Sequence, residues 1–502
     1  MQKSNTTKNL ATEAANAAKW SIVTEFVVRL ISPITTMVLA RVLTPAVFGV
    51  VATATMITSL GDMFSDTGFQ SYIIQHNFKD RDDEYLSASV AFWTNLVVSL
   101  FAVLLIIVFQ TSLAEILGIK GLGTVLVVAS LSLPITSLVS VQTALYRKSF
   151  DFKTLFASRT GSHLLIFFVS VPLAFLGFSY WSMILGTISS NLFMALWLTI
   201  QSPWKPRFEY SFYQLKQMFS YGAWILAESV SAWLNTWAGT FIIGALLNST
   251  LVGYYKTSTS ICAAVTGIVT SAVLPIVFRS LSILQDDEER FSAIFYQMQK
   301  YLALSLVPLA LGVFTYRQAF TMIALGPQWL DTSLFMGFWM LASCIVIVFG
   351  YMCSEAYRAK GKPKYCTLVQ VLYLIPFLPS LYFSAVGGYE TISIVVPFVR
   401  LSLVVINCMV AKKTLGLDPL SMLYNCRWCY IHSVLAMLPG LIVTAMTDSL
   451  IVAIFSIIIS IIIYCVLVVV TRDTRVSAFF LMSKLGLMKF LPTVLQRKLS
   501  ED

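Results

Sequence analysis

The stretch WSIVTEFVVRLISPITTMVLARVLTPAVFG, residues 20–49, sets the pattern for the rest of the chain. It predicts a long apolar helix that carries Glu25 and Arg29 one turn apart. The same spacing of Trp, Leu and Gly, which we call the frame of the repeat, recurs 204 residues later in WILAESVSAWLNTWAGTFIIGALLNSTLVG, which carries Glu228. The aligned pairs are Trp20 and Trp224, Leu43 and Leu247, and Gly49 and Gly253. The chain therefore repeats an apolar helix that contains charges, and both the helix and the charges need an explanation.

The composition is that of an integral membrane protein. Of the 502 residues, 57% are hydrophobic and 12% are charged, whereas soluble domains carry about 25% charged residues. The eight cysteines are scattered, so we expect no disulfide framework. Cys426, Cys429 and His432 have a spacing that suits a metal, but a second ligand pair is missing. We therefore expect these three side chains to be structural and no metal to be bound.

Apolar runs of about 20 residues predict membrane-spanning helices, and fourteen such runs follow one another along the chain. The predicted fold class is all-α and integral to the membrane. The expected spans are 19–40, 46–72, 87–110, 122–146, 157–177, 180–200, 220–246, 251–278, 294–316, 331–357, 366–385, 390–411, 430–447 and 449–470.

The placement of Lys and Arg predicts the orientation. With fourteen spans, 28 of the 34 cations fall in segments on the same side of the membrane as both termini. Cytoplasmic segments carry such an excess of cations, so we expect both termini in the cytoplasm. The net charge of +10 then follows from topology, and no nucleic-acid partner is expected.

The repeat divides the chain into two six-helix lobes around a central cavity. Because each copy enters the membrane from the same side, the two lobes form a parallel pseudo-repeat. An extra pair of helices and a basic amphipathic tail on the cytoplasmic membrane surface follow. The expected boundaries are 1–200 for the first lobe, 201–219 for an interfacial linker, 220–412 for the second lobe, 413–472 for the extra pair and 473–502 for the tail.

Charges within the spans are the main candidates for a substrate site. Arg29 lies about eleven residues into its span, at a depth of ~16 Å, where a charge costs about 2.5–3.5 kcal/mol on insertion scales. Glu25 stands four residues earlier on the same face. The pair is either an internal salt bridge or a lining of a hydrated cavity in which Glu25 orients Arg29. Arg400, midway along its span, has no such acidic neighbour.

Other polar residues are weaker candidates. Glu228 enters its span at the depth of Glu25, and two cations in the middle of the membrane suit an anionic substrate. The remaining cavity candidates are Asp62 and Asp66, which suit helix capping or pairing with loop cations at least as well. Cations near the outer surface that suit a periplasmic rim are Arg41, Lys256 and Arg317. Neutral groups that suit either sugar hydroxyls or helix packing are Asn95, Gln142, Asn191, Asn235 and Gln370. His163 is expected to make a helix-packing hydrogen bond.

Several stretches resemble bacterial polysaccharide exporters of the oligosaccharide-flippase type. LARVLTPAVFGVVATATMI (39–57) and FSDTGFQSYIIQ (64–75) resemble the N-terminal pattern of these exporters. ALYRKSFDFKTLFASRTGSHLL (144–165) is similar to the colanic-acid-exporter branch. LPIVFRSLSILQDDEERF (274–291) is similar to the wider multidrug/oligosaccharidyl-lipid/polysaccharide transporter superfamily. Arg400 matches no motif of the family.

The resemblance implies alternating access and a substrate of undecaprenyl-diphosphate-linked oligosaccharide, the precursor of an exopolysaccharide, capsule or O-antigen. It also implies the inner membrane as location, with membrane lipids and polysaccharide polymerase or assembly proteins as partners. The extra helix pair suits contact with the prenyl tail, packing or anchorage in lipid. The alternatives on the same fold are a cation-coupled antiporter of organic cations and a non-transporting scaffold. The chain has no ATP-binding or dinucleotide motif, so we expect no enzyme activity and no cofactor. Whether transport is coupled to an ion stays open, and H⁺ and Na⁺ are the candidates.

Overall fold

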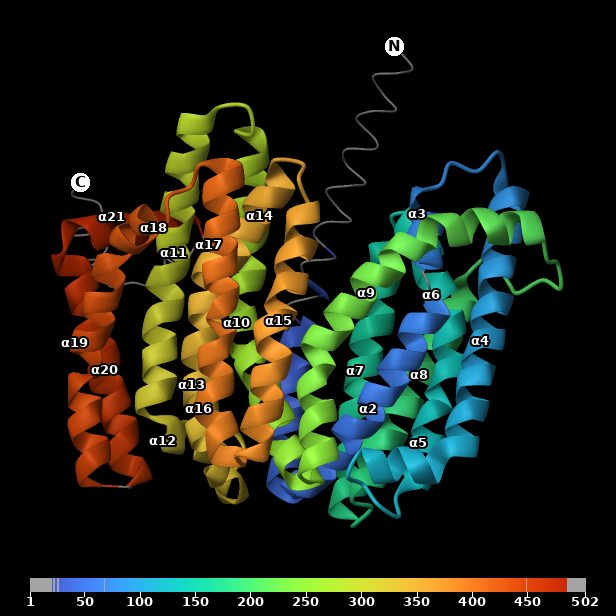
Figure 1. Ribbon diagram of the computed structural model, residues 1–502, viewed down its shortest axis with the longest axis horizontal. Helices are drawn as coiled ribbons and strands as arrows, with labels where there is room; N and C mark the ends of the chain where they lie inside the picture. Colours follow the sequence, from blue (N-terminus) through green and yellow to red (C-terminus); the bar gives the residue numbers. More distant parts are fainter. Residues whose placement is uncertain (1–19, 21–22, 25–26, 67, 448, 485–502) are drawn as a thin grey trace. The chain divides into compact units, whose positions relative to one another are not determined.

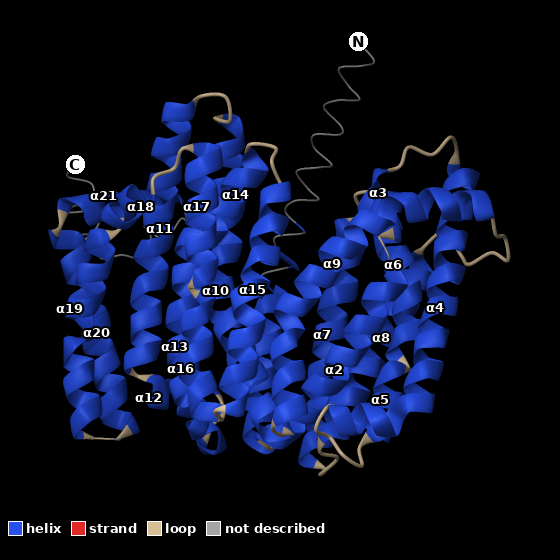
Figure 2. Ribbon diagram, viewed as in Figure 1, coloured by secondary structure: helices blue, strands red, loops and turns tan. Residues whose placement is uncertain are grey.

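The computed structural model describes residues 20, 23–24, 27–66, 68–447 and 449–484. Within these ranges the secondary structure is helical, joined by turns and short loops (Figure 2). The chain divides into two compact units, residues 1–256 and 257–502. The all-helical class expected from the sequence is confirmed.

The first unit contains a partly described first helix, which includes residues 27–42, and the helices that follow it to the start of α10 (Figure 1). These helices are α2 (Pro45–Asp66), α3 (Phe69–Gln75), α4 (Arg81–Ile116), α5 (Gly123–Ser130), α6 (Ser132–Lys148), α7 (Phe152–Phe175), α8 (Tyr180–Gln201), α9 (Phe212–Leu246) and α10 (Ser249–Ile283). One expected span, 122–146, is divided between α5 and α6 at Leu131, shortly before Pro134.

The second unit begins inside α10 and contains the remaining helices, among them a 3₁₀ turn (η1) and a π-helical turn (η2) inside one span. They are α11 (Glu288–Thr315), α12 (Arg317–Ala324), η1 (Pro327–Thr332), α13 (Ser333–Ile345), η2 (Val346–Tyr351), α14 (Met352–Ala359), α15 (Lys364–Val386), α16 (Tyr389–Arg400), α17 (Ser402–Leu415), α18 (Pro419–Asn425), α19 (Arg427–Met446), α20 (Leu450–Val470) and α21 (Arg472–Lys484).

Twelve helices in the described ranges are long and apolar enough to cross a membrane. The protein is therefore a multi-pass membrane protein. The two expected spans beyond these twelve are 19–40, which lies partly outside the described residues, and 220–246, which lies within α9. The count of fourteen stays a prediction.

Side-chain caps fix the starts of several helices. The carboxylate of Asp80 accepts a hydrogen bond from the backbone of Asp83 at 2.8 Å at the start of α4, and Asp151 does the same for Thr154 at 3.1 Å at the start of α7. Such caps satisfy backbone N–H groups that a first helical turn leaves without partners. Further caps are Ser211 of α9, Asn248 of α10, Asp287 of α11 and Asp418 of α18. All of these caps except Asn248 lie on the side predicted to be cytoplasmic.

The repeated frame has a direct packing consequence at two glycines. A Cβ atom on Gly49 would lie 1.7 Å from the carbonyl oxygen of Ser249, and one on Gly253 would lie 1.9 Å from that of Pro45. These two contacts are equivalent, because Gly49 and Gly253 are 204 positions apart in the repeat, as are Pro45 and Ser249. The first turns of α2 and α10 therefore cross backbone to backbone, which only glycine permits.

The extra pair, α19 and α20, packs on α11 and α12. The hydroxyl of Tyr316 lies 2.8 Å from the hydroxyls of both Ser456 and Ser460 on α20. The hydroxyl of Tyr464 donates to the carbonyl of Leu304 at 2.6 Å. Many side chains of α20 remain exposed, such as Ile451 and Phe455. One face of the pair thus packs on protein, and the other presents apolar side chains that suit lipid.

The division after Lys256 falls later than the expected linker, because α9 packs on α2, α3 and α4. Residues 202–211 are irregular, and residues 212–219 already belong to α9. Phe208 is exposed, whereas Trp204 is buried and donates to the carbonyl of Tyr85 at 3.2 Å. Of the expected tail, α21 packs on α11, α19 and α20, and residues 485–502 lie outside the described ranges. The lobe and tail boundaries stay predictions.

Candidate functional site

A polar cavity of about 710 Å³ lies within the first unit. Its walls come from α2, α3, α4, α6, α7, α8 and α9. The polar side chains that line it are Ser59, Asp62, Gln70, Ser71, Asn95, Thr136, Ser137, Ser140, Thr143, Arg147, Arg159, Ser229 and Trp233. Polar groups are expensive within membrane-spanning helices unless they face one another, a hydrated space or a ligand. Their concentration around one cavity makes it the candidate functional site.

The periodicity of α6 explains how one helix contributes so many polar groups. Thr136, Ser140, Thr143 and Arg147 follow one another at steps of four, three and four residues. This spacing places them on one face of a helix. The opposite face of α6 is apolar, and Val141 and Ala144 are buried in the core with α4. The amphipathic pattern thus turns a polar stripe toward the cavity.

Arg147 and Arg159 give the cavity a cationic character. Arg147 donates from Nη1 to Gln70 Oε1 at 2.9 Å, and Gln70 in turn donates to the hydroxyl of Ser140 at 3.3 Å. This chain of hydrogen bonds orients the Arg147 side chain. Asp62 lines the same cavity and accepts a hydrogen bond from the hydroxyl of Thr136 at 2.5 Å. Two arginines and one aspartate leave the described lining with a formal charge of +1.

Trp233 adds an aromatic surface to the lining. Its indole N–H donates to the hydroxyl of Ser59 at 3.0 Å, which fixes the position of the ring. Trp233 is the equivalent, in the second copy of the repeat, of Arg29 in the first. The two copies therefore place different chemistry at the same position of their frame.

The other predicted cavity residues of the first unit lie elsewhere or are not described. Glu25 lies outside the described residues, as does the side chain of Asp66. Glu228 is exposed on α9. Arg29 is half-buried, on the helix whose Ser32 hydroxyl lies 3.2 Å from His163 Nδ1. That contact confirms the expected helix-packing hydrogen bond of His163.

Arg400 belongs to the second unit. It ends α16, and a break at Leu401 separates it from α17. Its guanidinium lies 4.2 Å from the ring centroid of Trp339, in cation–π geometry. The partial negative charge that the helix dipole places at the carboxyl end of α16 also stabilises the Arg400 cation. The role of Arg29 and Arg400 as substrate ligands stays a prediction.

The predicted rim cations take three different positions. Arg41 is exposed. Lys256 lies with its ammonium 3.6 Å from the ring centroid of Trp237. Arg317 lies 5.8 Å from the ring centroid of Phe314 and lines a cavity of about 350 Å³ between α12 and the extra helix pair.

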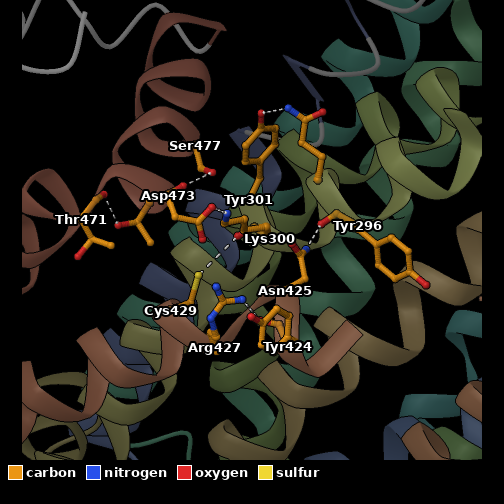
Figure 3. Close-up of polar contacts among 12 residues, drawn as sticks. Tyr296, Lys300, Tyr301, Tyr424, Asn425, Arg427, Cys429, Thr471, Asp473 and Ser477 are labelled. Carbon is orange, nitrogen blue, oxygen red and sulfur yellow. Dashed lines mark hydrogen bonds and ion pairs between the residues drawn. The ribbon is translucent and has the colours of Figure 1, made fainter. Parts of the chain in front are cut away.

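A second polar cavity, of about 560 Å³, lies where α11, α18 and α21 meet (Figure 3). Lys300 of α11 is buried there and forms an ion pair with Asp473 of α21. Asn425 of α18 donates to the carbonyl of Tyr296 at 2.5 Å. The ion pair thus joins α21 to α11, and the hydrogen bond joins α18 to α11. Nearby, Cys429 is buried and His432 is hydrogen-bonded to Thr471 at 2.9 Å.

Comparison with known families identifies the chain. A family described as polysaccharide biosynthesis protein matches residues 38–334, more than half of the sequence. The chain belongs to this family. The match confirms the resemblance to polysaccharide exporters that the sequence motifs carry. Every described residue that lines the 710 Å³ cavity, from Ser59 to Trp233, lies within the region that defines the family.

Curated relatives in the family are named for polysaccharide synthesis and transport. The chain is 24% identical over 323 residues to the succinoglycan biosynthesis transport protein ExoT of Rhizobium meliloti. It is 20% identical over 327 residues to the lipopolysaccharide biosynthesis protein WzxC of Escherichia coli. Each alignment covers 64% of this chain, and the chain spans 64% of the length of ExoT and 65% of that of WzxC.

Solved structures show the same fold. The lipid II flippase MurJ in an inward closed conformation matches with a TM-score of 0.73 at 13% identity, over 93% of this chain and all of that chain. An inward-facing multidrug transporter of the MATE family matches with a TM-score of 0.55 at 12% identity, over 80% of this chain and 94% of that one. The family therefore shares its fold with transporters of different substrates, and fold alone does not choose between them.

The cavity of this family member includes residues that the sequence analysis did not select. Arg147 and Arg159 were counted among the cytoplasmic cations that set the topology, because each lies near the end of its helix. The signal that identifies Arg147 is the polar stripe of α6, which the span assignment ignores. Trp233 carries no such signal, because an aromatic residue in an apolar helix is ordinary.

Proposed function

We propose that this protein is an inner-membrane flippase that moves an undecaprenyl-diphosphate-linked oligosaccharide from the cytoplasmic to the periplasmic leaflet. The main support is the cavity that combines Arg147 and Arg159 with neutral polar groups inside helices that are able to span a membrane. The names of ExoT and MurJ, a transport protein and a lipid flippase, agree with this proposal.

The chemistry of the substrate explains why such a cavity is needed. Moving one charge from water into a medium like hydrocarbon costs on the order of 20 kcal/mol in the idealised limit, and a diphosphate carries more than one charge. The planar guanidinium group of an arginine can bind two phosphate oxygens at once. The hydroxyls of Ser140 and Thr136 supply further polar contacts. The cavity thus replaces the hydration that the headgroup loses.

The arginines also suggest the point of entry. Arg147 lies in the last turn of α6, and Arg159 lies about two turns into α7, both in the parts of these helices nearest the predicted cytoplasmic side. A headgroup that arrives from the cytoplasmic leaflet therefore meets these cations first. In an alternating-access cycle the diphosphate stays with the arginines while the sugar end reaches the neutral groups deeper in α4 and α9, and the prenyl chain stays in the lipid.

The charge of the cavity favours this function over export of organic cations. A cation antiporter needs carboxylates that are available to the drug or to protons. The described lining holds one carboxylate, that of Asp62, and it accepts a hydrogen bond from Thr136. Two guanidinium groups in the same cavity repel a cation.

Deletion of the gene tests the proposal. We expect lipid-linked oligosaccharide to accumulate and the polymer to be lost, and the wild-type gene to restore it. Arg159→Ala should fail to restore the polymer at normal expression. Lys153→Ala is the matched control, because Lys153 lies on the same helix and is exposed. Unchanged polymer without accumulation of the intermediate would reject the flippase function.

A further inference from the structure

The cavity contains buried polar groups that the protein does not satisfy. Asn95 of α4 and Thr143 of α6 line the cavity and are only 1% and 5% exposed. Among the described residues, neither Asn95 Oδ1 nor Thr143 Oγ1 has a hydrogen-bond partner. Gln142, next to Thr143 in sequence, is also fully buried without partners for its amide atoms, but it is not among the residues that line the cavity. Buried polar groups without partners are unfavourable, so each needs an explanation.

Neighbouring polar groups of the same wall show that the fold can satisfy such groups. The hydroxyls of Ser99 and Ser137 lie 3.2 Å apart, also between α4 and α6. Among the described residues that line the cavity, Asn95 and Thr143 are the two with a buried side-chain atom that lacks a partner. The amide oxygen of Asn95 can accept a hydrogen bond, and the hydroxyl of Thr143 can both donate and accept.

The same cavity offers an aromatic ring, because Trp233 lines it with the indole held by Ser59. A sugar presents an apolar C–H face, which suits an aromatic ring, and hydroxyls that each donate and accept. The volume of about 710 Å³ lies within the ~300–1,000 Å³ of small-molecule sites. It suits one end of a lipid-linked oligosaccharide and not a whole repeat unit.

We infer that this cavity recognises the sugar next to the diphosphate, with Asn95 and Thr143 bonded to its hydroxyls and Trp233 against its face. The inference rests on the proposed function and deepens it, because it divides the cavity into two parts. Arg147 and Arg159 bind the diphosphate of any substrate. The amide and hydroxyl groups of α4 and α6 determine which sugar is accepted, since a site built to bond a hydroxyl discriminates strongly against its absence.

Binding to the purified full-length protein in lipid nanodiscs tests this division. The probes are farnesyl diphosphate and its adducts with glucose, galactose and N-acetylglucosamine. We expect one sugar adduct to bind at least about tenfold more tightly than farnesyl diphosphate itself. Asn95→Leu and Thr143→Val should each reduce that preference about two- to tenfold, the equivalent of one hydrogen bond. Neither substitution should change the affinity for bare farnesyl diphosphate.

Two controls separate the possible failures. Asn235→Leu removes an amide that also has an unpartnered oxygen but lies outside the cavity lining, so the sugar preference should not change. Arg147→Ala should weaken all probes alike. Thr143→Val keeps the shape of the side chain, so it tests the inference even if Asn95→Leu fails to fold. Equal affinities for all probes in wild-type protein would overturn the sugar site and leave the flippase proposal standing. Failure of every probe to bind would overturn both.

Discussion

The ion pair between Lys300 and Asp473 predicts how firmly α21 is held. The side chain of Lys300 is 10% exposed and that of Asp473 is 43% exposed. Breaking a fully buried pair costs about 3–5 kcal/mol, because one charge stays buried alone, whereas exposed pairs contribute about 0.2–1 kcal/mol. Since Asp473 is half-exposed and Lys300 is not, Asp473→Asn should cost about 2 kcal/mol. The population in which α21 is detached should then rise about 30-fold.

Cys429 reports on this detachment. Its thiol is fully buried and lies 4.0 Å from the carbonyl oxygen of Lys300. Alkylation by N-ethylmaleimide, followed by mass spectrometry, measures how often the region opens. We expect the rate at Cys429 to rise about 30-fold in Asp473→Asn. The rate at Cys262, fully buried on α10, should not change and controls for global unfolding.

An exposed ion pair in the same unit provides the matched comparison. Lys412 and Asp418 lie 3.6 Å apart with side chains 67% and 40% exposed, so Lys412→Gln should alter the rate at Cys429 less than about twofold. Replacing both partners, as in Lys300→Met with Asp473→Leu, should return the rate toward wild type, because no charge is left buried. An unchanged rate in Asp473→Asn would show that the ion pair does not hold α21.

Three further predictions concern stability. Gly253→Ala should lower the melting temperature by the equivalent of about 1–3 kcal/mol, because its Cβ would lie 1.9 Å from a carbonyl oxygen. Gly312→Ala is the control and should not lower it, because the nearest atom to its Cβ would lie at 3.8 Å. Equal melting temperatures of the two variants would contradict the backbone crossing. Arg400→Gln should cost about 0.5–2 kcal/mol by loss of the cation–π contact with Trp339, and Trp339→Leu should make the cost disappear in a double-mutant cycle of melting temperatures. The backbone N–H of Ser421 lowers the pKa of the Asp418 carboxyl below its usual 3.8. The ionised carboxylate therefore stabilises the folded protein fully above about pH 4, and this contribution is lost as pH falls through the lowered pKa. The stability difference between wild type and Asp418→Ala should shrink only in acid, and a difference that grew there would contradict the assignment.

The helices were predictable because hydrophobic period and length determine them. The expected spans from 87–110 to 180–200 each match helices of the structure, and the caps at Asp80 and Asp151 lie in the polar segments between spans. The helix-packing role of His163 was also predictable, since a lone polar group on an apolar helix needs a partner from a neighbour. These features depend on local sequence and on general rules of membrane insertion.

The cavity was not predictable in the same way, because it forms where several helices converge. Arg159 and Gln70 are far apart in sequence, and neither lies near the middle of a span. An argument from depth alone selects Arg29 and Arg400, whose burial is expensive, and passes over Arg147, which lies at a helix end. Only the packing of α3 against α6 shows that Gln70 receives the guanidinium of Arg147.

The repeat that opened the sequence analysis now separates packing from chemistry. Gly49 and Gly253 make equivalent backbone contacts, so both copies carry glycine at the point of closest approach. At the positions where the first copy carries Glu25 and Arg29, the second carries Ser229 and Trp233, and both of these line the cavity. The frame thus keeps the helix crossing, while the residues on this face of the helix are free to differ. A cavity that binds a diphosphate and a sugar needs such asymmetry, because its two halves recognise different chemical groups.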